Sequence, residues 1–268
     1  MYLPPVHQDS YVTDAQRHQK YRSRKVFKGP FWFYPRYGLL IMWSGIKFLF
    51  TRDPQAAVSL QGRRVMSIAE RHGAHFTCEG MENLSKVQGP FVFACNHMST
   101  LEVNALPGII AYRMPIAFVV KKSLMKIPFL SGVLKRLDCI TVERKHPGED
   151  LMQVLKQGEE LLRKGTSVIL FPESTRQDVF HPGKFNSLAI KLALKANVPV
   201  IPVALKTDFW GSGKMIKDFG PLDENKPVHI RFGEPLVPSG RGKAEHQKAV
   251  EFIRSHLEEW GVPILGSE

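Results

Sequence analysis

A histidine and a carboxylate stand five residues apart after a short apolar run. Residues 91–95 are apolar, Asn96 and His97 end the run, and Glu102 follows. An apolar run of this length with a polar boundary predicts a buried strand, and ligands of α/β proteins bind beyond the carboxyl ends of such strands. His97 is therefore a candidate general base, because imidazole titrates near neutral pH, and Glu102 is a candidate orienting partner.

The spacing of this pair sets a condition on the local structure. Five residues along one helix turn a side chain through about 500°, so two side chains inside the helix would point apart. His97 and Glu102 meet only if the histidine lies in the loop and the glutamate in the first helical turn. Ser99 and Thr100 are suitable N-cap residues for such a helix. The spacing alone fits a capping carboxylate beside an ordinary loop histidine equally well.

Polar and charged side chains also follow three other runs that predict strands, residues 115–120, 139–142 and 167–170. If the strands are parallel, these ends share the sheet edge that carries His97. Lysine and arginine there suit a phosphate group, and the arginine fork matches a phosphate dianion. A glutamate and an arginine three residues apart are otherwise typical of a surface ion pair. The residues concerned are Lys121, Arg144, Glu173, Ser174, Thr175 and Arg176.

Four blocks in this order resemble the signatures of the glycerolipid acyltransferase family, the 1-acylglycerol-3-phosphate acyltransferases. The blocks are Asn96-His97 with Glu102, residues 121–129 closing at 140–144, residues 171–176, and residues 198–204. The resemblance implies an O-acyltransferase of phospholipid biosynthesis. Such an enzyme moves a fatty acyl group from acyl-CoA or acyl carrier protein to the free hydroxyl of a lysophospholipid. The foremost acceptor is lysophosphatidate, which becomes phosphatidate.

The resemblance also implies roles for the candidate residues. His97 deprotonates the acceptor hydroxyl and Glu102 orients it, while Lys121, Arg144 and Arg176 grip the acceptor phosphate. Glu173 holds the arginine or an acceptor hydroxyl, and Ser174 and Thr175 belong to the same substrate-binding block. Asn96 is either an oxyanion donor or a brace for the loop. No metal and no bound cofactor are expected, because the acyl carrier is a substrate.

Three positions depart from the family pattern that the resemblance implies. Glu102 stands where the family usually has Asp, Ser174 stands where it usually has Gly, and Ser131-Gly132 places the glycine of the second block one position late. These departures leave the reaction in place but keep other acceptors open, namely glycerol-3-phosphate, another lysophospholipid or a lyso-aminolipid.

The composition favours an anionic partner. The 268 residues carry a formal net charge of +12 and are 43% hydrophobic, enough for a real core. Zinc-finger spacings and RNP-type aromatic runs are missing from the sequence, so we expect no nucleic-acid partner. The scattered cysteines Cys78, Cys95 and Cys139 predict a reduced protein, and Cys95 and Cys139, which lie in apolar runs, are expected to be small core residues.

The amino-terminal part predicts contact with an anionic membrane surface. Residues 1–30 form a basic, partly disordered arm, whose basic residues are Lys20, Arg22, Arg24, Lys25 and Lys28. Residues 31–73 form a helical membrane-associating segment. Its aromatic run is interrupted by Pro35 and Arg36, so an interfacial anchor is favoured over a span. We therefore expect a peripheral or monotopic protein on the cytoplasmic face. The alternative is a core helix that packs on the domain.

Residues 74–268 predict an α/β acyltransferase domain with a mainly parallel sheet flanked by helices. Pro199 and Pro202 predict an edge or irregular strand at residues 198–205, and residues 207–227 are a long loop and a candidate lid. A rival from another class is a non-catalytic, basic, peripheral membrane-binding protein. That rival gives no reason for the polar residues at successive strand ends.

Overall fold

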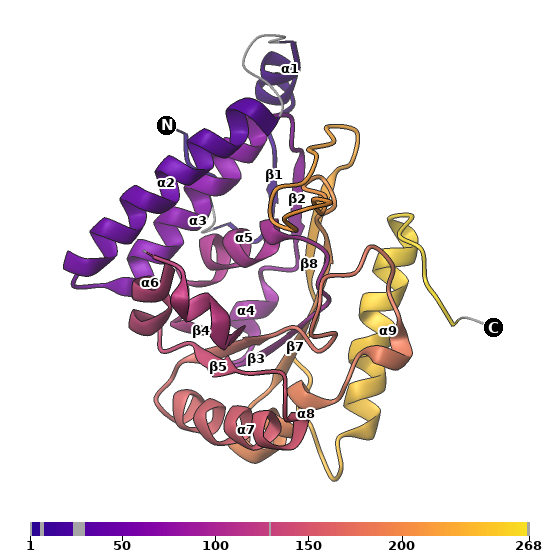
Figure 1. Cartoon of the computed structure of the whole chain (residues 1–268). Helices are drawn as coiled ribbons and strands as arrows, with labels where there is room; N and C mark the ends of the chain where they lie inside the picture. The colour runs from indigo at the N-terminus through magenta and orange to yellow at the C-terminus, as the bar shows by residue number, and fades with distance from the viewer. Residues whose placement is uncertain (1, 6–7, 24–29, 129, 267–268) are drawn as a thin grey trace.

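The sheet at the centre of the molecule is mixed but mostly parallel (Figure 1). The computed structural model describes residues 2–5, 8–23, 30–128 and 130–266. The strand order is β1-β2-β8-β7-β3-β6-β4-β5. The strands are β1 (Tyr11–Val12), β2 (Phe76–Glu79), β3 (Val92–Cys95), β4 (Ile116–Lys121), β5 (Ile140–Val142), β6 (Ser167–Leu170), β7 (Val200–Lys206) and β8 (Val228–Phe232). Only the β1–β2 and β7–β8 pairs among these strands are antiparallel, which confirms the predicted fold class.

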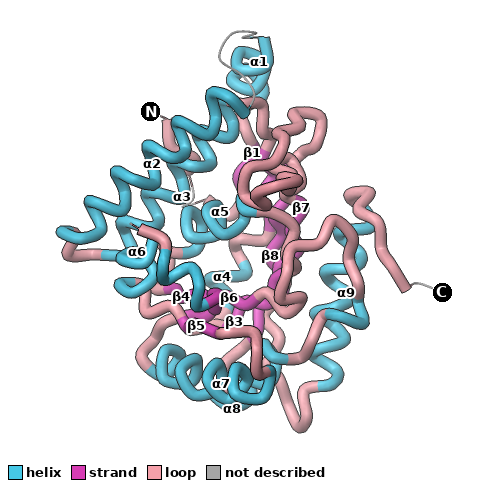
Figure 2. The backbone as a smooth tube through the Cα atoms, in the orientation of Figure 1, coloured by secondary structure: helices cyan, strands magenta, loops and turns pink. Residues whose placement is uncertain are grey.

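Helices cover both faces of the sheet (Figure 2). They are α1 (Ala15–Ser23), α2 (Pro30–Phe50), α3 (Pro54–Arg71), α4 (Asn83–Lys86), α5 (Thr100–Ile110), α6 (Leu130–Arg136), α7 (Pro147–Arg163), α8 (Leu188–Ala196) and α9 (Lys243–Glu259). Short 3₁₀ turns occur at Lys122–Lys126 and Pro182–Lys184.

Alternation along the strands divides the interior into two cores. Phe93 and Cys95 of β3 face a core shared with α3 and α5, whereas Val92 and Ala94 face a core shared with α7, α8 and α9. Because both faces of β3 are buried, the strand is apolar at every position, as parallel strands between two helical layers are.

The helix that carries Glu102 packs unusually closely on its neighbour. A Cβ atom on Gly62 of α3 would lie 2.4 Å from the backbone nitrogen of Gly108 in α5. Glycine at both positions therefore lets the two backbones approach. This contact fixes α5, and with it the position of its amino terminus at the sheet edge.

The predicted helices at the amino-terminal end are present, and α2 has two apolar sides. Phe33 and Phe48 are buried in the core, whereas Trp43 and Phe50 are 55% and 80% exposed. Asp53 caps α3 through a 3.0 Å hydrogen bond from the Ala56 amide, as its sequence indicates. In the described ranges, no helix combines the length and the apolar character that a membrane span requires.

The prediction of an edge or irregular strand at residues 198–205 is wrong. β7 lies between β8 and β3, and all its residues are buried. The amide of Val200 donates to the carbonyl of Leu236 at 2.8 Å. Since backbone nitrogens alternate sides along a strand, the nitrogen of Pro202 also faces away from β3. Pro202 thus removes no hydrogen bond from the parallel ladder, and its carbonyl accepts the Gly233 amide at 2.8 Å.

The amino-terminal arm contains regular structure among its described residues. Tyr11–Val12 pair with β2 at the sheet edge, and Ala15 begins α1. Tyr11 is 4% exposed and donates its hydroxyl to Glu70, 59 residues away, a contact that local sequence pattern does not reveal. Arg24, Lys25 and Lys28 of the basic cluster lie outside the described residues.

Candidate active site

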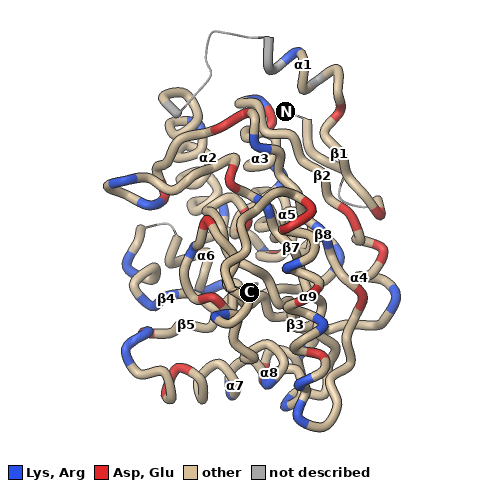
Figure 3. Tube along the Cα trace, turned by 90° about the vertical axis from the view of Figure 1, so that its right-hand side faces the viewer, with Lys and Arg blue, Asp and Glu red and all other residues tan. Residues whose placement is uncertain are grey.

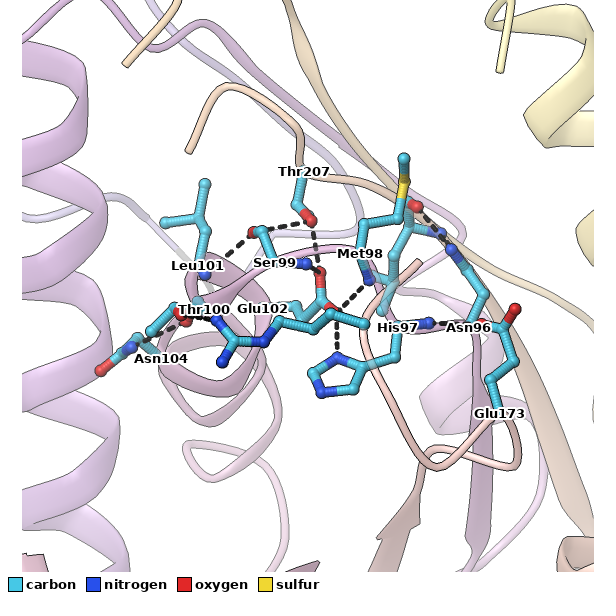
Figure 4. A network of polar contacts seen from close by, with 12 residues as sticks. Asn96, His97, Met98, Ser99, Thr100, Leu101, Glu102, Asn104, Glu173 and Thr207 are labelled. Atoms are coloured by element: carbon cyan, nitrogen blue, oxygen red, sulfur yellow. Dashed lines mark hydrogen bonds and ion pairs between the residues drawn. The ribbon is translucent and has the colours of Figure 1, made fainter. Parts of the chain in front are cut away.

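The loop after β3 meets the condition that the His97–Glu102 spacing imposes (Figure 4). Ser99 is the N-cap of α5, and its hydroxyl accepts the Leu101 amide at 3.0 Å. His97 lies before the cap and Glu102 in the first turn. Their side chains meet, with 2.5 Å between Nδ1 of His97 and Oε1 of Glu102.

Glu102 is buried and held through both carboxylate oxygens. Oε1 accepts the amide of Met98 at 2.7 Å as well as the His97 ring, and Oε2 accepts the amide of Ser99 at 3.2 Å. Oε2 also accepts the hydroxyl of Thr207. The side chain is 0% exposed. Glu102 therefore performs two tasks, since it caps the helix and fixes the histidine ring.

The ring of His97 is fixed in orientation but open on one side. It stacks on Phe171 with 4.3 Å between ring centroids, and 15% of its side chain is exposed. Because a carboxylate oxygen faces Nδ1, that nitrogen carries the proton and Nε2 presents its lone pair. The described residues supply no hydrogen-bond partner for Nε2. This is the geometry of a general base.

Glu173 contacts the loop that carries His97 and does not contact Arg176. Its Oε2 accepts the backbone amide of His97 at 2.8 Å, while its Oε1 is buried without a partner in the described part of the chain. The pKa of Glu173 is raised to about 7, mainly by burial; the His97 amide acts to lower this pKa, and the charge of Glu102 acts to raise it. The predicted contact between Glu173 and the arginine is therefore wrong. A contact with an acceptor hydroxyl remains a prediction.

Arg176 lies beside the amino terminus of α5. Its Nη1 donates to the hydroxyl of Thr100 at 2.6 Å, and its Nη2 pairs with Asp218 at 2.8 Å. Asp218 also accepts the Thr100 hydroxyl at 2.8 Å. Thr100 is two residues before Glu102, so these contacts place the guanidinium close to the His97 pair.

Ser174 and Thr175 form the turn between Glu173 and Arg176. Ser174 has a φ of 63°, in the left-handed region that favours glycine. This backbone conformation explains why glycine is the residue that the resemblance implies there. The amide of Ser174 donates to the Phe171 carbonyl at 3.0 Å, and both side chains are exposed.

Lys121 and Arg144 share the sheet edge but stand further along it. β3 pairs with β6, β6 with β4, and β4 with β5, all in parallel. Both side chains are exposed, in a region near β4, β5 and α6 where basic residues gather (Figure 3). Within the described residues, no hydrogen bond or ion pair joins either of them to His97 or Arg176.

The contacts of Asn96 favour the brace over the oxyanion donor. Its Nδ2 donates to the carbonyl of Leu205 and its Oδ1 accepts the Leu205 amide, both at 2.8 Å. The residue is 1% exposed. Asn96 thus joins the end of β3 to β7 and holds the start of the loop that carries His97.

Sequence reasoning missed Thr207 and Asp218. Thr207 follows β7, and β7 is the direct neighbour of β3. The available signal was a hydroxyl at a strand end, but the edge assignment of residues 198–205 removed that strand from the vicinity of His97. In the described ranges, no three His, Cys, Asp or Glu side chains are grouped so that they could hold a metal ion.

A histidine held by a buried carboxylate at the edge of a parallel sheet, with an open imidazole nitrogen, suits an enzyme that activates a hydroxyl. Residues 75–206 match the protein-family model described as Acyltransferase. The chain is 31% identical over 189 residues to the 1-acyl-sn-glycerol-3-phosphate acyltransferase of Pseudomonas aeruginosa, covering 70% of this chain and 68% of that protein. These observations define an acyltransferase. More particularly, the chain belongs to the 1-acyl-sn-glycerol-3-phosphate acyltransferase family.

Two further relatives agree with this assignment. The chloroplastic 1-acyl-sn-glycerol-3-phosphate acyltransferase LPAT1 of Arabidopsis thaliana is 32% identical over 174 residues, which cover 62% of this chain and 47% of that protein. The crystal structure of the 1-acyl-sn-glycerophosphate (LPA) acyltransferase PlsC from Thermotoga maritima aligns with a TM-score of 0.65 and 23% identity, covering 87% of this chain and 94% of that chain. The structural likeness establishes the fold.

Proposed function

We propose that this acyltransferase moves a fatty acyl group from a thioester donor to the free hydroxyl of lysophosphatidate, giving phosphatidate. The observation that carries the proposal is the 2.5 Å contact between His97 Nδ1 and the buried Glu102, which leaves Nε2 open. The name of the Pseudomonas aeruginosa relative, a 1-acyl-sn-glycerol-3-phosphate acyltransferase, supports this acceptor.

In the proposed reaction His97 acts first as base and then as acid. The acceptor hydroxyl gives its proton to Nε2 while its oxygen bonds to the thioester carbonyl carbon. Glu102 stabilises the resulting imidazolium. When the tetrahedral intermediate collapses, the C–S bond breaks and the leaving thiolate takes the proton from Nε2. General base catalysis contributes about 10²–10⁴-fold, so positioning of the substrates must contribute much of the remainder.

The acceptor phosphate is assigned to the basic side chains along the sheet edge. Arg176 is joined to the first turn of α5, which carries Glu102, through the hydroxyl of Thr100, and Lys121 and Arg144 extend the positive edge. An arginine fork matches two phosphate oxygens at once. The turn at Ser174 and Thr175 completes this substrate-binding block. The donor, acyl-CoA or acyl carrier protein, is a substrate of the same site.

The exposed side of α2 is assigned to an anionic membrane surface, with residues 31–73 as the associating segment and residues 74–268 as the acyltransferase domain. Leu39, Trp43 and Phe50 are 53%, 55% and 80% exposed, and their spacing keeps them on one helical face. Trp favours the headgroup level of a bilayer. This supports a peripheral or monotopic enzyme, and its placement at the cytoplasmic face is part of the proposal.

The test is acyl transfer by the purified protein in mixed micelles, with lysophosphatidate and either labelled acyl-CoA or labelled acyl carrier protein. We expect phosphatidate with at least one donor, and a loss of about a hundredfold or more in His97→Ala. His246→Ala, on α9, is the matched control and is expected to retain activity.

The outcomes separate the parts of the proposal. Product only from glycerol-3-phosphate, another lysophospholipid or a lyso-aminolipid would overturn the acceptor and keep the chemistry. An active His97→Ala would overturn the base. Lipid binding without turnover on any acceptor would favour the alternative of a non-catalytic, basic, peripheral membrane-binding protein. The contact between His97 and Glu102 is an argument against that alternative.

A further inference from the structure

The loop between β7 and β8 (orange in Figure 1) is buried and held by several contacts where it leaves the sheet. Trp210 is 1% exposed, and its ring meets Phe33 and Tyr37 of α2 with centroid distances of 4.8 and 5.0 Å. The amide of Gly211 donates to the carbonyl of Pro221 at 2.9 Å. The chain between these two residues therefore doubles back as a closed projection.

Apolar side chains occupy the end of this projection. Met215 is 98% exposed, Ile216 58% and Phe219 56%. Lys214 and Lys217, both exposed, flank them. A group of apolar side chains offered to water and bordered by cations is typical of an interaction surface, because such side chains are stabilised only when something covers them.

Close backbone approaches give the projection its shape. A Cβ atom on Gly213 would lie 2.2 Å from the carbonyl oxygen of Ile216, and one on Gly220 would lie 1.8 Å from that of Gly211. Only glycine fits at these two crossings. The apolar end is therefore held outward by the backbone itself.

The projection is continuous with the exposed apolar side of α2. The ring of Phe219 contacts that of Tyr34 with 4.9 Å between centroids, and the Tyr34 hydroxyl donates to the carbonyl of Gly220 at 2.6 Å. Tyr34 is three residues from Phe31, which is 78% exposed. On its inner side the loop places Asp218 on Arg176. It thus lies between the apolar side of α2 and the candidate active site.

We propose that residues 213–219 dock on an anionic lipid surface as a second contact beside α2. Met215 and Ile216 enter the acyl boundary, Phe219 lies at the headgroup level, and Lys214 and Lys217 meet lipid phosphates. The lipid occupant follows from the paired lysines and from continuity with α2. The inference rests on the proposed function only for the roles of α2 and Arg176, and it adds a surface through which a lipid acceptor reaches Arg176.

The test is sedimentation of the full-length protein with vesicles of phosphatidylcholine alone or of equal parts phosphatidylcholine and phosphatidylglycerol. Met215→Ser combined with Ile216→Ser is expected to weaken binding to both vesicles by about tenfold or more. Lys214→Gln combined with Lys217→Gln is expected to weaken only binding to the anionic vesicles, by about tenfold. Met152→Ser on α7, where Met152 is 66% exposed, is the matched control.

Two results would overturn the inference. One is a Met215→Ser/Ile216→Ser protein that binds both vesicles as the parent does. The same result is expected if the apolar end of the projection binds a protein partner instead of lipid. The other is a lysine variant that loses no anionic preference. Thermal melting verifies that each variant is folded. Because binding is measured without turnover, His97→Ala should bind as the parent does, so failure of docking and failure of the proposed reaction are separate results.

Discussion

In the proposed reaction Thr207 is a positioning residue, because its hydroxyl contacts Glu102 and Ser99 at the start of α5. Its hydroxyl donates to Oε2 of Glu102 and accepts the Ser99 hydroxyl at 2.9 Å. Thr207→Val keeps the shape and removes both contacts. We expect kcat to fall about tenfold with little change in KM, because His97 is less well oriented while the substrate contacts remain.

Steady-state kinetics check this prediction, and Thr207→Ser is the control variant. A serine restores the hydroxyl, so it should recover most of the lost kcat. If serine is as impaired as valine, the effect comes from packing and the assigned role is wrong.

Among the polar contacts of the candidate site, the local ones could be predicted from the sequence and the long-range ones could not. The meeting of His97 and Glu102 was predictable because it depends on a helix boundary, and Ser99 provides that boundary. The partners of Asn96 and Glu102 across the sheet were not, since Leu205 and Thr207 lie 109 and 105 residues further along the chain. Such contacts depend on strand order, which local periodicity does not encode.

Glu173 should make the stability of the protein depend on pH. Its pKa is raised from the ordinary value of 4.5 to about 7, mainly by burial. The folded state therefore keeps a proton that the unfolded chain loses near pH 4.5. The stabilisation is fully present below about pH 4.5 and is lost as the pH rises to about 7, with a total change of about 3 kcal/mol.

Glu173→Gln removes this titration and keeps an oxygen for the His97 amide. The free energy of unfolding of the parent should thus fall relative to the variant between about pH 5 and about pH 8. Urea denaturation across that range measures the difference. A difference that stays constant with pH would contradict the raised pKa.

At the scale of elements, the crossing of α3 and α5 is the contact most sensitive to size. A Cβ on Gly62 would lie 2.4 Å from the Gly108 nitrogen and 2.5 Å from the Asn104 carbonyl oxygen, both backbone atoms. Gly62→Ala must separate the helices, and we expect a loss of about 2–4 kcal/mol in the free energy of unfolding. Activity should fall too, because α5 carries Glu102.

Gly38→Ala on α2 is the control for this substitution. A Cβ atom there meets nothing within 4 Å, so alanine should be neutral or stabilising by about 0.5–1 kcal/mol through helix propensity. Chemical denaturation of both variants is the measurement. Equal effects of the two alanines would mean that the close approach does not limit the packing.

The loop between β7 and β8 also sets a prediction about the acceptor. Asp218 pairs with Arg176, so under the proposed function its carboxylate would compete with the acceptor phosphate for the guanidinium. Asp218→Asn should lower the KM for lysophosphatidate about two- to fivefold, the range of a partly exposed ion pair, with kcat nearly unchanged. A raised KM in this assay would mean that Asp218 positions Arg176 instead of competing for it.

Element types were more predictable than their neighbours in space. The apolar runs predicted β3, β4, β5 and β6 because each strand contributes apolar side chains to the core. The place of β7 was not predictable from its prolines, since Pro202 costs nothing when its nitrogen faces away from the ladder. The pairing of β1 was missed because two residues are too few for a periodic pattern.

At the scale of the whole molecule, net charge and exposed apolar area contribute to lipid binding in ways that respond differently to salt. The net charge of +12 predicts attraction to anionic lipid that salt screens. The exposed side of α2 predicts an apolar contribution that salt leaves in place. The sequence alone allows two alternatives for this helix, a membrane anchor or a core helix. Its two apolar sides, one buried and one exposed, are compatible with both.

Substitutions on the exposed side of α2 separate these contributions. Trp43→Ser combined with Phe50→Ser removes side chains that are 55% and 80% exposed, so folding should be preserved. We expect binding to phosphatidylcholine and to mixed anionic vesicles to fall by about a hundredfold.

Raising the salt concentration from about 0.1 M to about 1 M should abolish the preference of the parent for anionic vesicles while its binding to neutral ones persists. Vesicle sedimentation at both salt concentrations is the measurement, with Met152→Ser as control. If the double variant retained full affinity for neutral vesicles, α2 would not be the membrane contact, and charge alone would have to account for binding.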